Sequence, residues 1–247
     1  MQDAYIVSAL RTPIGKKKGS LSNMHPADLG AAILSATFDR VDLDPGLVED
    51  VIFGCVDTVG PQAGDIARTC WLAAGLPEHV PGTTVDRQCG SSQQAVHFAS
   101  QAIMSGTADV VIAGGVQNMN MIPISYAMLA GQALGFDDPF SGSIGWVKRY
   151  GNQEVSQFNS AQMIAEKWKI SRAEMESFAF ESHQKAMRAI NAKHFVDEIV
   201  PIGDFHTDET PRAETSLEKM ASLNPIIEGH DITAAISSQN ADASSAI

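Results

Sequence analysis

The sequence predicts an α/β protein: a layered α-β-α core with a mixed, mostly parallel sheet, interrupted by an inserted loop domain. Three observations lead to this class. Strand-like and helix-like segments alternate through the first part of the chain, an order typical of parallel sheets. Residues 110–113 are continuously apolar, as in a strand buried on both faces. From about Gln117 the periodicity weakens, and a β pattern resumes at Asp231–Ala235.

The elements of the predicted core come first along the chain. Apolar or β-branched runs predict strands at Tyr5–Leu10, Asp50–Val56, Thr83–Val85 and Asp109–Ala113. Apolar residues at helical spacing predict helices at Pro26–Val41, Asp65–Leu76 and Ser91–Met104. In the last helix, the side chains expected to face inward are Ala95, Phe98, Ala99, Ala102 and Ile103.

The second half of the chain has a different character. Residues 117–152 are rich in Met, Gly, Ser and Pro, which predicts loop. Helices are expected at Ser156–Trp168 and from Ser171 to about Ala192, the second opening with a capping box. A strand is expected at Phe195–Ile202, and Ala241–Ile247 begins a further element. The predicted domains are a core over 1–118, an inserted domain over 119–230 and a return to the core over 231–247.

Composition narrows the class of function. The formal net charge is −12 with histidines neutral, which disfavours a nucleic-acid partner because nucleic acids bind basic surfaces. No apolar run approaches the ~20 residues of a membrane span, and the first residues do not resemble a signal peptide. Cys55, Cys70 and Cys89 form no CxxC pair. This pattern predicts neither a disulfide framework nor a metal site and favours the cytoplasm.

Cys89 is the residue best placed for covalent chemistry. It lies between a buried-looking strand and a helix, where the positive end of the helix dipole favours a thiolate. The following Gly90 allows a ligand to approach closely. Other α/β enzymes present nucleophiles in the same strand–turn–helix geometry. A structural role remains the alternative reading of this cysteine, and it is the predicted role of Cys55 and Cys70.

Several motifs resemble those of the thiolase family. Thr83–Ala95, which reads T-T-V-D-R-Q-C-G-S-S-Q-Q-A, resembles the family's nucleophile segment, and Arg11–Gly15 resembles its opening motif. Later blocks follow in the family's order at Gln62–Pro77, Ala113–Met119, Ser216–Ala221 and Thr233–Asp242. The match covers nearly the whole chain. The sequence is therefore identified as the N-terminal portion of a thiolase.

The resemblance implies an acyl-CoA acyltransferase. Cys89 would attack the keto carbon of a 3-oxoacyl-CoA, acetyl-CoA would leave, and a second CoA would take the acyl group; the reverse reaction condenses two acyl-CoA molecules. The backbone N–H of Cys89 would help to bind the thioester oxyanion. CoA and acyl-CoA are then substrates, with no permanently bound cofactor and no metal. The resemblance also implies a homodimer or tetramer.

Three residues match family positions around CoA. Arg212 resembles an arginine near the nucleotide end, Ser238 a serine beside the pantetheine arm, and Ala234 a residue that lines the same tunnel. An ordinary solvated role for Arg212 stays open. Gln157-Phe158 stands where acetoacetyl-specific members carry a His-Met pair, so that specificity is not expected.

The family's other catalytic groups lie in a C-terminal half. Its Gly-His-Pro histidine and Cys-Gly-Gly cysteine have no counterpart here, and His230, in Gly229-His230-Asp231, is predicted to be a surface loop residue. The 247-residue chain alone is therefore expected to be inactive. One alternative is a non-catalytic CoA-ester-binding module, or a half-enzyme that needs a partner. A second, a ketosynthase-type condensing enzyme, is disfavoured by the motifs at Arg11, Gln62 and Ser216.

Overall fold

A computed structural model describes residues 2–247, which divide into two compact units. The core unit contains the residues up to 130 together with 195–210 and 240–247, and the loop unit contains 131–194 and 211–239. These boundaries differ from the predicted domains. Residues 119–130 and 195–210 pack with the core, and residues 231–239 pack with the loop unit. Each unit is described separately.

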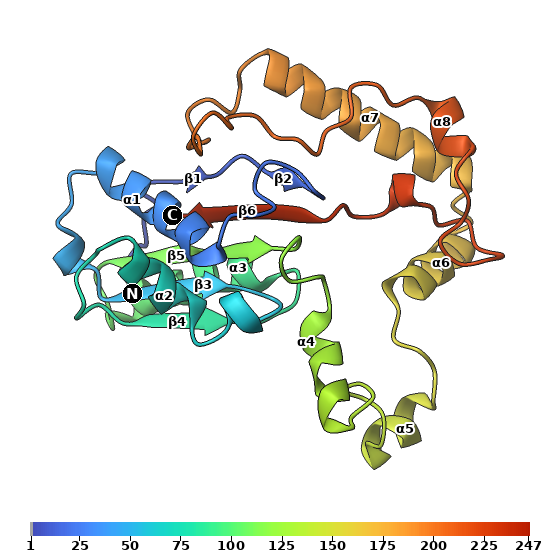
Figure 1. Cartoon of the computed structure of the whole chain (residues 1–247), viewed down its shortest axis with the longest axis horizontal. Coiled ribbons are helices and arrows are strands. Elements are labelled where there is room, and N and C mark those ends of the chain that lie inside the picture. The colour runs from blue at the N-terminus through green and yellow to red at the C-terminus, as the bar shows by residue number, and fades with distance from the viewer. Residues whose placement is uncertain (1) are drawn as a thin grey trace. The chain divides into compact units, whose positions relative to one another are not determined.

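The core unit is built on one mixed sheet of six strands (Figure 1). In spatial order these are β1 (Leu10–Arg11), β6 (Ala241–Ala246), β5 (Val111–Asn118), β3 (Asp50–Gly54) and β4 (Gly82–Val85), while β2 (Gly15–Lys16) also pairs with β6. Parallel pairing joins β5, β3 and β4, whereas β6 is antiparallel to β5, β1 and β2. The last segment of the chain is thus an interior strand of the sheet.

Helices cover both faces of this sheet and complete the predicted α-β-α layers. On one face, α1 (Pro26–Arg40) and α2 (Ile66–Ala73) enclose the larger hydrophobic cluster. On the other face, α3 (Ser91–Ser105) packs through Ala95 and Ala99. Successive residues of β3 alternate between the two clusters, Phe53 pointing to the first and Ile52 to the second. The short helices η1 (Pro45–Leu47) and η2 (Gly60–Gln62) lie in connections.

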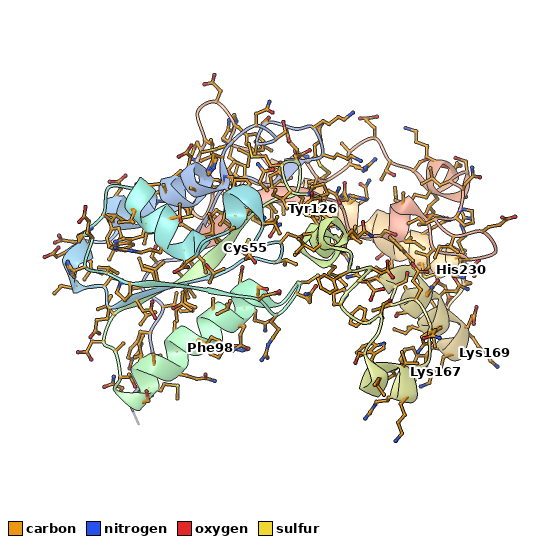
Figure 2. The ribbon with its side chains drawn as sticks, turned by 60° about the horizontal axis from the view of Figure 1, so that its bottom comes forward. Cys55, Phe98, Tyr126, Lys167, Lys169 and His230 are labelled. Atoms are coloured by element: carbon orange, nitrogen blue, oxygen red, sulfur yellow. The ribbon has the colours of Figure 1, made fainter. Side chains whose placement is uncertain are left out.

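Phe98 does not face inward as predicted. Phe98 lies on α3 (Figure 2), and the residue is 41% exposed. The residues of α3 that pack into the cluster with Ile52 and Ala113 of the sheet are Ala95 and Ala99, and Phe98 is not part of that cluster.

Three predicted strands are wrong. Of Tyr5–Leu10 only Leu10 lies in β1, and Tyr5 is 77% exposed. Phe195–Ile202 makes only isolated bridges, and Asp231–Ala235 contains one bridge followed by η4 (Ala234–Ile236). An apolar run becomes a strand only where a neighbour completes its hydrogen-bond ladder, and the neighbours of the two later segments pair with them at isolated positions only, such as Arg11 with Ile199.

Helices dominate the remainder of the chain. The predicted pair is present as α6 (Gln157–Trp168) and α7 (Arg172–Asn191), and the capping box between Ser171 and Glu174 is confirmed. Residues 117–152, predicted as loop, contain three short helices: α4 (Tyr126–Leu129), η3 (Ala130–Leu134) and α5 (Ile144–Tyr150). A last helix, α8, spans Leu217–Ala221. Within residues 2–247, no helix combines the length and apolarity needed to cross a membrane.

Candidate functional site

Cys89 lies in a tight turn between β4 and α3. Its predecessor Gln88 has φ of 49°, in the left-handed region that non-glycine residues rarely adopt. The Gly90 N–H donates to Arg87 O at 3.1 Å, and the Ser91 N–H donates to Gln88 O at 3.0 Å. These bonds close the turn and leave the Cys89 side chain exposed to solvent.

The Ser91 hydroxyl holds the turn together from the first residue of α3. Its Oγ accepts the Arg87 N–H at 2.8 Å and donates to Gln88 O at 2.6 Å. Ser91 itself is buried. A left-handed, non-glycine residue costs about 1–3 kcal/mol and persists only where its surroundings fix it. The backbone of Cys89 is therefore held in one conformation immediately before a helix N-terminus.

Two glycines seat the start of α3 directly on the sheet. A Cβ on Gly54 of β3 would lie 2.2 Å from Ser92 N, and one on Gly115 of β5 would lie 2.1 Å from Ser92 Oγ. Both distances are far below van der Waals contact. The absence of side chains at these two strand positions thus allows the helix to approach and fixes the height of the Cys89 turn above the sheet.

The other two cysteines have the opposite environment, as predicted. Burial, reinforced by the charge of Asp57, raises the pKa of Cys55 to about 12. Burial also raises the pKa of Cys70 to about 12. The Cys55 thiol lies 3.5 Å from Gln117 Oε1, and Figure 2 places it at the end of β3. Because the thiolate is the reactive form, Cys55 and Cys70 are poorly suited to nucleophilic attack.

The loop unit contains a cavity of about 740 Å³ between α7 and residues 235–239. Its apolar lining includes Met175, Phe178 and Ile236, and its polar lining includes His183 and Ser238. Volumes of 300–1,000 Å³ are typical of small-molecule sites. The cavity therefore has room for a long ligand with apolar and polar parts.

The three residues matched to CoA contacts all belong to the loop unit. Ser238 lines the cavity, and Ala234 begins η4, one residue before the lining starts. Thr233 caps this turn, since its Oγ1 accepts the Ala235 N–H at 3.3 Å. Arg212 is exposed at the rim, where its Nη2 donates to Gln239 Oε1 at 3.4 Å. Of the three, Ser238 lines the cavity, whereas Ala234 precedes a lining residue in sequence and Arg212 contacts two lining residues, His183 and Gln239.

His183 is an ionisable residue of this cavity that the motifs did not identify. Its Nδ1 accepts the backbone N–H of Arg212 at 3.2 Å. Burial, followed by the charge of Arg212, lowers the pKa of the imidazole below its ordinary value. The signal in the sequence that could have identified it is helical spacing. Met175 and Ala179 precede His183 by eight and four residues and so lie on the same face of α7.

His230 was predicted to be a surface loop residue. It lies in a loop (Figure 2), but the side chain is only partly exposed. Its Nδ1 is buried and has no hydrogen-bond partner among the described residues. Among residues 2–247, no three His, Cys, Asp or Glu side chains lie close enough together to hold a metal ion.

Comparisons with known proteins agree on one family. The family model described as "Thiolase, N-terminal domain" matches residues 4–247. A Mycobacterium tuberculosis protein named steroid 3-ketoacyl-CoA thiolase FadA6 is 56% identical over the whole chain, which covers 61% of that protein. A 3-ketoacyl-CoA thiolase from Aliivibrio salmonicida is 36% identical over the whole chain and 64% of its own length.

A solved structure gives the same result. The acetyl-CoA acetyltransferase of Bacillus anthracis superposes on the whole chain with a TM-score of 0.80 at 30% identity, and 65% of that protein is covered. The chain therefore spans a little under two thirds of the length of the relatives it matches.

Proposed function

The chain belongs to the thiolase family, and from that premise we propose that the whole protein transfers acyl groups between CoA thioesters through a covalent intermediate on Cys89. The Cys89 thiolate attacks the keto carbon of a 3-oxoacyl-CoA. The bond between C2 and C3 breaks, and acetyl-CoA leaves after its carbanion takes a proton. The thiol of a second CoA then attacks the Cys89 thioester and releases acyl-CoA. The reverse sequence condenses two acyl-CoA molecules.

The observation that carries this proposal is the Cys89 turn. An exposed thiol stands at the start of α3, in a backbone conformation that Gln88 and Ser91 fix. Hydrogen-bond donors preorganised around a developing oxyanion lower the barrier of acyl transfer. We assign the backbone N–H of Cys89 this part, next to the positive end of the helix dipole.

The cavity of the loop unit is our proposed site for CoA. Met175, Phe178 and Ile236 offer apolar contacts to the pantetheine arm, with Ser238 and Ala234 beside it. Arg212, exposed at the rim, supplies a cation for a phosphate of the nucleotide. The molecule as a whole is acidic, so this local charge is significant for an anionic ligand.

The acyl group is proposed to be larger than acetoacetyl. The relative at 56% identity carries the name of a steroid 3-ketoacyl-CoA thiolase. Gln157-Phe158 replaces the His-Met pair expected of acetoacetyl-specific members. A ring-bearing 3-oxoacyl-CoA is therefore the first substrate class to test, with acetoacetyl-CoA as the comparison.

The remaining proposals concern the setting of the reaction. CoA and acyl-CoA are substrates, and no resident cofactor is needed for the two transfers. A homodimer or tetramer fits the family. A location in the cytoplasm fits the three cysteines, which form no disulfide. Nucleic acid is not a proposed partner, since the net charge is −12.

The experiment is CoA-dependent cleavage of a 3-oxoacyl-CoA by the full-length protein and its Cys89→Ala variant. Removing the nucleophile should lower kcat by at least about 10³-fold, because substitution of a covalent nucleophile removes the whole pathway. Mass spectrometry should find the acyl group on the peptide containing Cys89. The Cys55→Ala variant serves as a control and should retain acylation. CoA binding without any acylated Cys89 would instead favour a non-catalytic binding module.

A further inference from the structure

His183 connects α7 to the segment that carries Arg212. The two residues are 29 positions apart in the sequence, yet His183 Nδ1 accepts the Arg212 N–H at 3.2 Å. In a neutral imidazole, one nitrogen accepts and the other carries the proton. Because Nδ1 accepts here, the proton of the neutral ring is on Nε2. The hydrogen bond therefore requires the neutral ring.

Arg212 extends from this anchor to the other wall of the cavity. Its backbone is held at α7 by His183, and its guanidinium contacts Gln239 Oε1. Both His183 and Gln239 line the cavity of about 740 Å³. A long, exposed side chain is otherwise free to rotate, and a ligand must then restrict it on binding. The anchor at the backbone and the Gln239 contact at the guanidinium together restrict Arg212, so it loses less freedom when it binds an anion.

The surroundings favour the neutral ring at pH 7. Burial, and then the charge of Arg212, lowers the pKa of His183. The facing segment, residues 235–239, contains no ionisable side chain, and Glu174 is the other ionisable residue among those lining the cavity. Protonation of Nδ1 would remove the acceptor and place a second positive charge beside Arg212.

We propose that His183 is a positioning residue, which holds Arg212 at the cavity rim so that its guanidinium binds a phosphate of the CoA nucleotide. The inference rests on the proposed function, because it takes CoA as the ligand of this cavity. It assigns a role in substrate affinity to a residue outside the acyl-transfer chemistry.

The test uses the full-length protein and three variants: His183→Ala, His183→Asn and Arg212→Ala. The Ala variant should raise KM for CoA about threefold to tenfold with little change in kcat, since one hydrogen bond contributes about that factor. In the Asn variant the side-chain oxygen takes the place of Nδ1 as acceptor, so KM should stay within about twofold of the parent. Equal losses in the two variants would overturn the proposal. Matching thermal unfolding curves control for damage to the fold.

A double-mutant cycle separates positioning from direct contact. If His183 acts through Arg212, adding His183→Ala to Arg212→Ala should raise KM no further. A second, independent increase would show that His183 acts on the ligand itself and would overturn the proposal. If neither single substitution changes KM while Cys89→Ala still abolishes transfer, the inference fails and the thiolase activity stands.

The pH profile gives a second readout. As pH falls from about 8 to 5, protonation of Nδ1 should raise KM for CoA toward the value of the Ala variant. The ratio of parent to Asn-variant KM cancels the titration of CoA itself. That ratio should rise at low pH, and a flat ratio would contradict the role of Nδ1 as acceptor.

Discussion

Burial separates Cys55 and Cys70 from Cys89. Cys89 is exposed in its turn, whereas burial raises the pKa of both Cys55 and Cys70 to about 12. At pH 8 a thiol of that pKa is ionised in roughly one molecule in ten thousand. A reagent that alkylates thiolates should therefore modify Cys89 and spare the two buried cysteines.

Limiting iodoacetamide at pH 8 should modify Cys89 in the folded protein and leave Cys55 and Cys70 unmodified. The physical reason is that alkylation requires both exposure and a thiolate. Peptide mapping by mass spectrometry measures the three sites. Labelling in urea is the control, and there all three should react. Preferential labelling of either buried cysteine in the folded state would contradict the assignment of Cys89.

The left-handed backbone at Gln88 gives a second prediction. Gln88→Val should lose about 1–2 kcal/mol of stability, because a β-branched side chain clashes in that region. It should also lower kcat by displacing the neighbouring Cys89. Gln88→Gly should retain both properties, since glycine adopts this conformation freely. Gln93→Val, at an exposed position of α3, is the matched control. Urea unfolding and the cleavage assay measure the effects.

The position of a residue in the fold was predictable from the sequence where the geometry that determines it is local. Cys89 follows a β-branched run and precedes an amphipathic helix, and these local neighbours predict a turn at this position. His183 was missed because its partner, the Arg212 N–H, comes from a distant segment. No local pattern encodes that pairing.

At the scale of elements, helices depend on local residues, whereas strands depend on distant partners. The helices α1, α3, α6 and α7 were predicted because caps and periodicity lie within each segment. Tyr5–Leu10 and Phe195–Ile202 are apolar enough for strands, but a strand depends on a partner that its own residues do not specify. β6 was predicted only as an unassigned element, since Ala and Ser carry little strand preference.

Gly115 gives a prediction about the contact between the start of α3 and the sheet. A Cβ there would lie 2.1 Å from Ser92 Oγ and 2.5 Å from Gly54 O. Gly115→Ala should push the helix start away from the sheet, with a loss of about 1–3 kcal/mol of stability and a lower kcat. Gly145→Ala is the matched control, because its Cβ meets nothing within 4 Å and it lies inside α5. Equal stability and activity of the two variants would show that α3 can shift freely.

Arg11 of β1 links residues 195–210 to the sheet through ion pairs. Its guanidinium donates to Asp208 at 2.7 and 3.0 Å and to Glu198 at 2.6 Å. Asp208 is largely buried and also accepts the Ile14 N–H at 2.8 Å. This network explains why the segment belongs to the core unit although it forms no strand.

Arg11→Lys should lower the free energy of unfolding by about 1.5–3 kcal/mol, because an ammonium cannot reproduce the two-pronged contact with Asp208. Urea denaturation monitored by circular dichroism measures the change. Lys17→Ala, at an exposed position of the neighbouring turn, should have no measurable effect. A Lys variant as stable as the parent would mean that the charge alone, without its geometry, holds the segment.

At the scale of the whole molecule, the sheet of the core unit ends on β4. β4 pairs with β3 on one side, and no described strand pairs with its other side. Thr83, in the middle of this strand, is exposed. Native proteins seldom leave a β-branched edge strand open, because it offers backbone groups to any other strand. The strand leads directly to the Cys89 turn, so whatever covers it also stiffens the approach to the nucleophile.

We therefore expect the full-length protein to be at least a dimer, with two copies of β4 paired about a two-fold axis. Sedimentation at micromolar concentration measures the mass of the parent and of Thr83→Lys, in which two lysines would meet at the axis. The variant should dissociate to monomers and lose activity in proportion, because the turn after β4 would lose its support. Thr107→Lys, at an exposed position after α3, adds the same charge elsewhere and should remain associated. A monomeric parent protein would refute the dimer, and an unchanged Thr83→Lys assembly would place the contact away from β4.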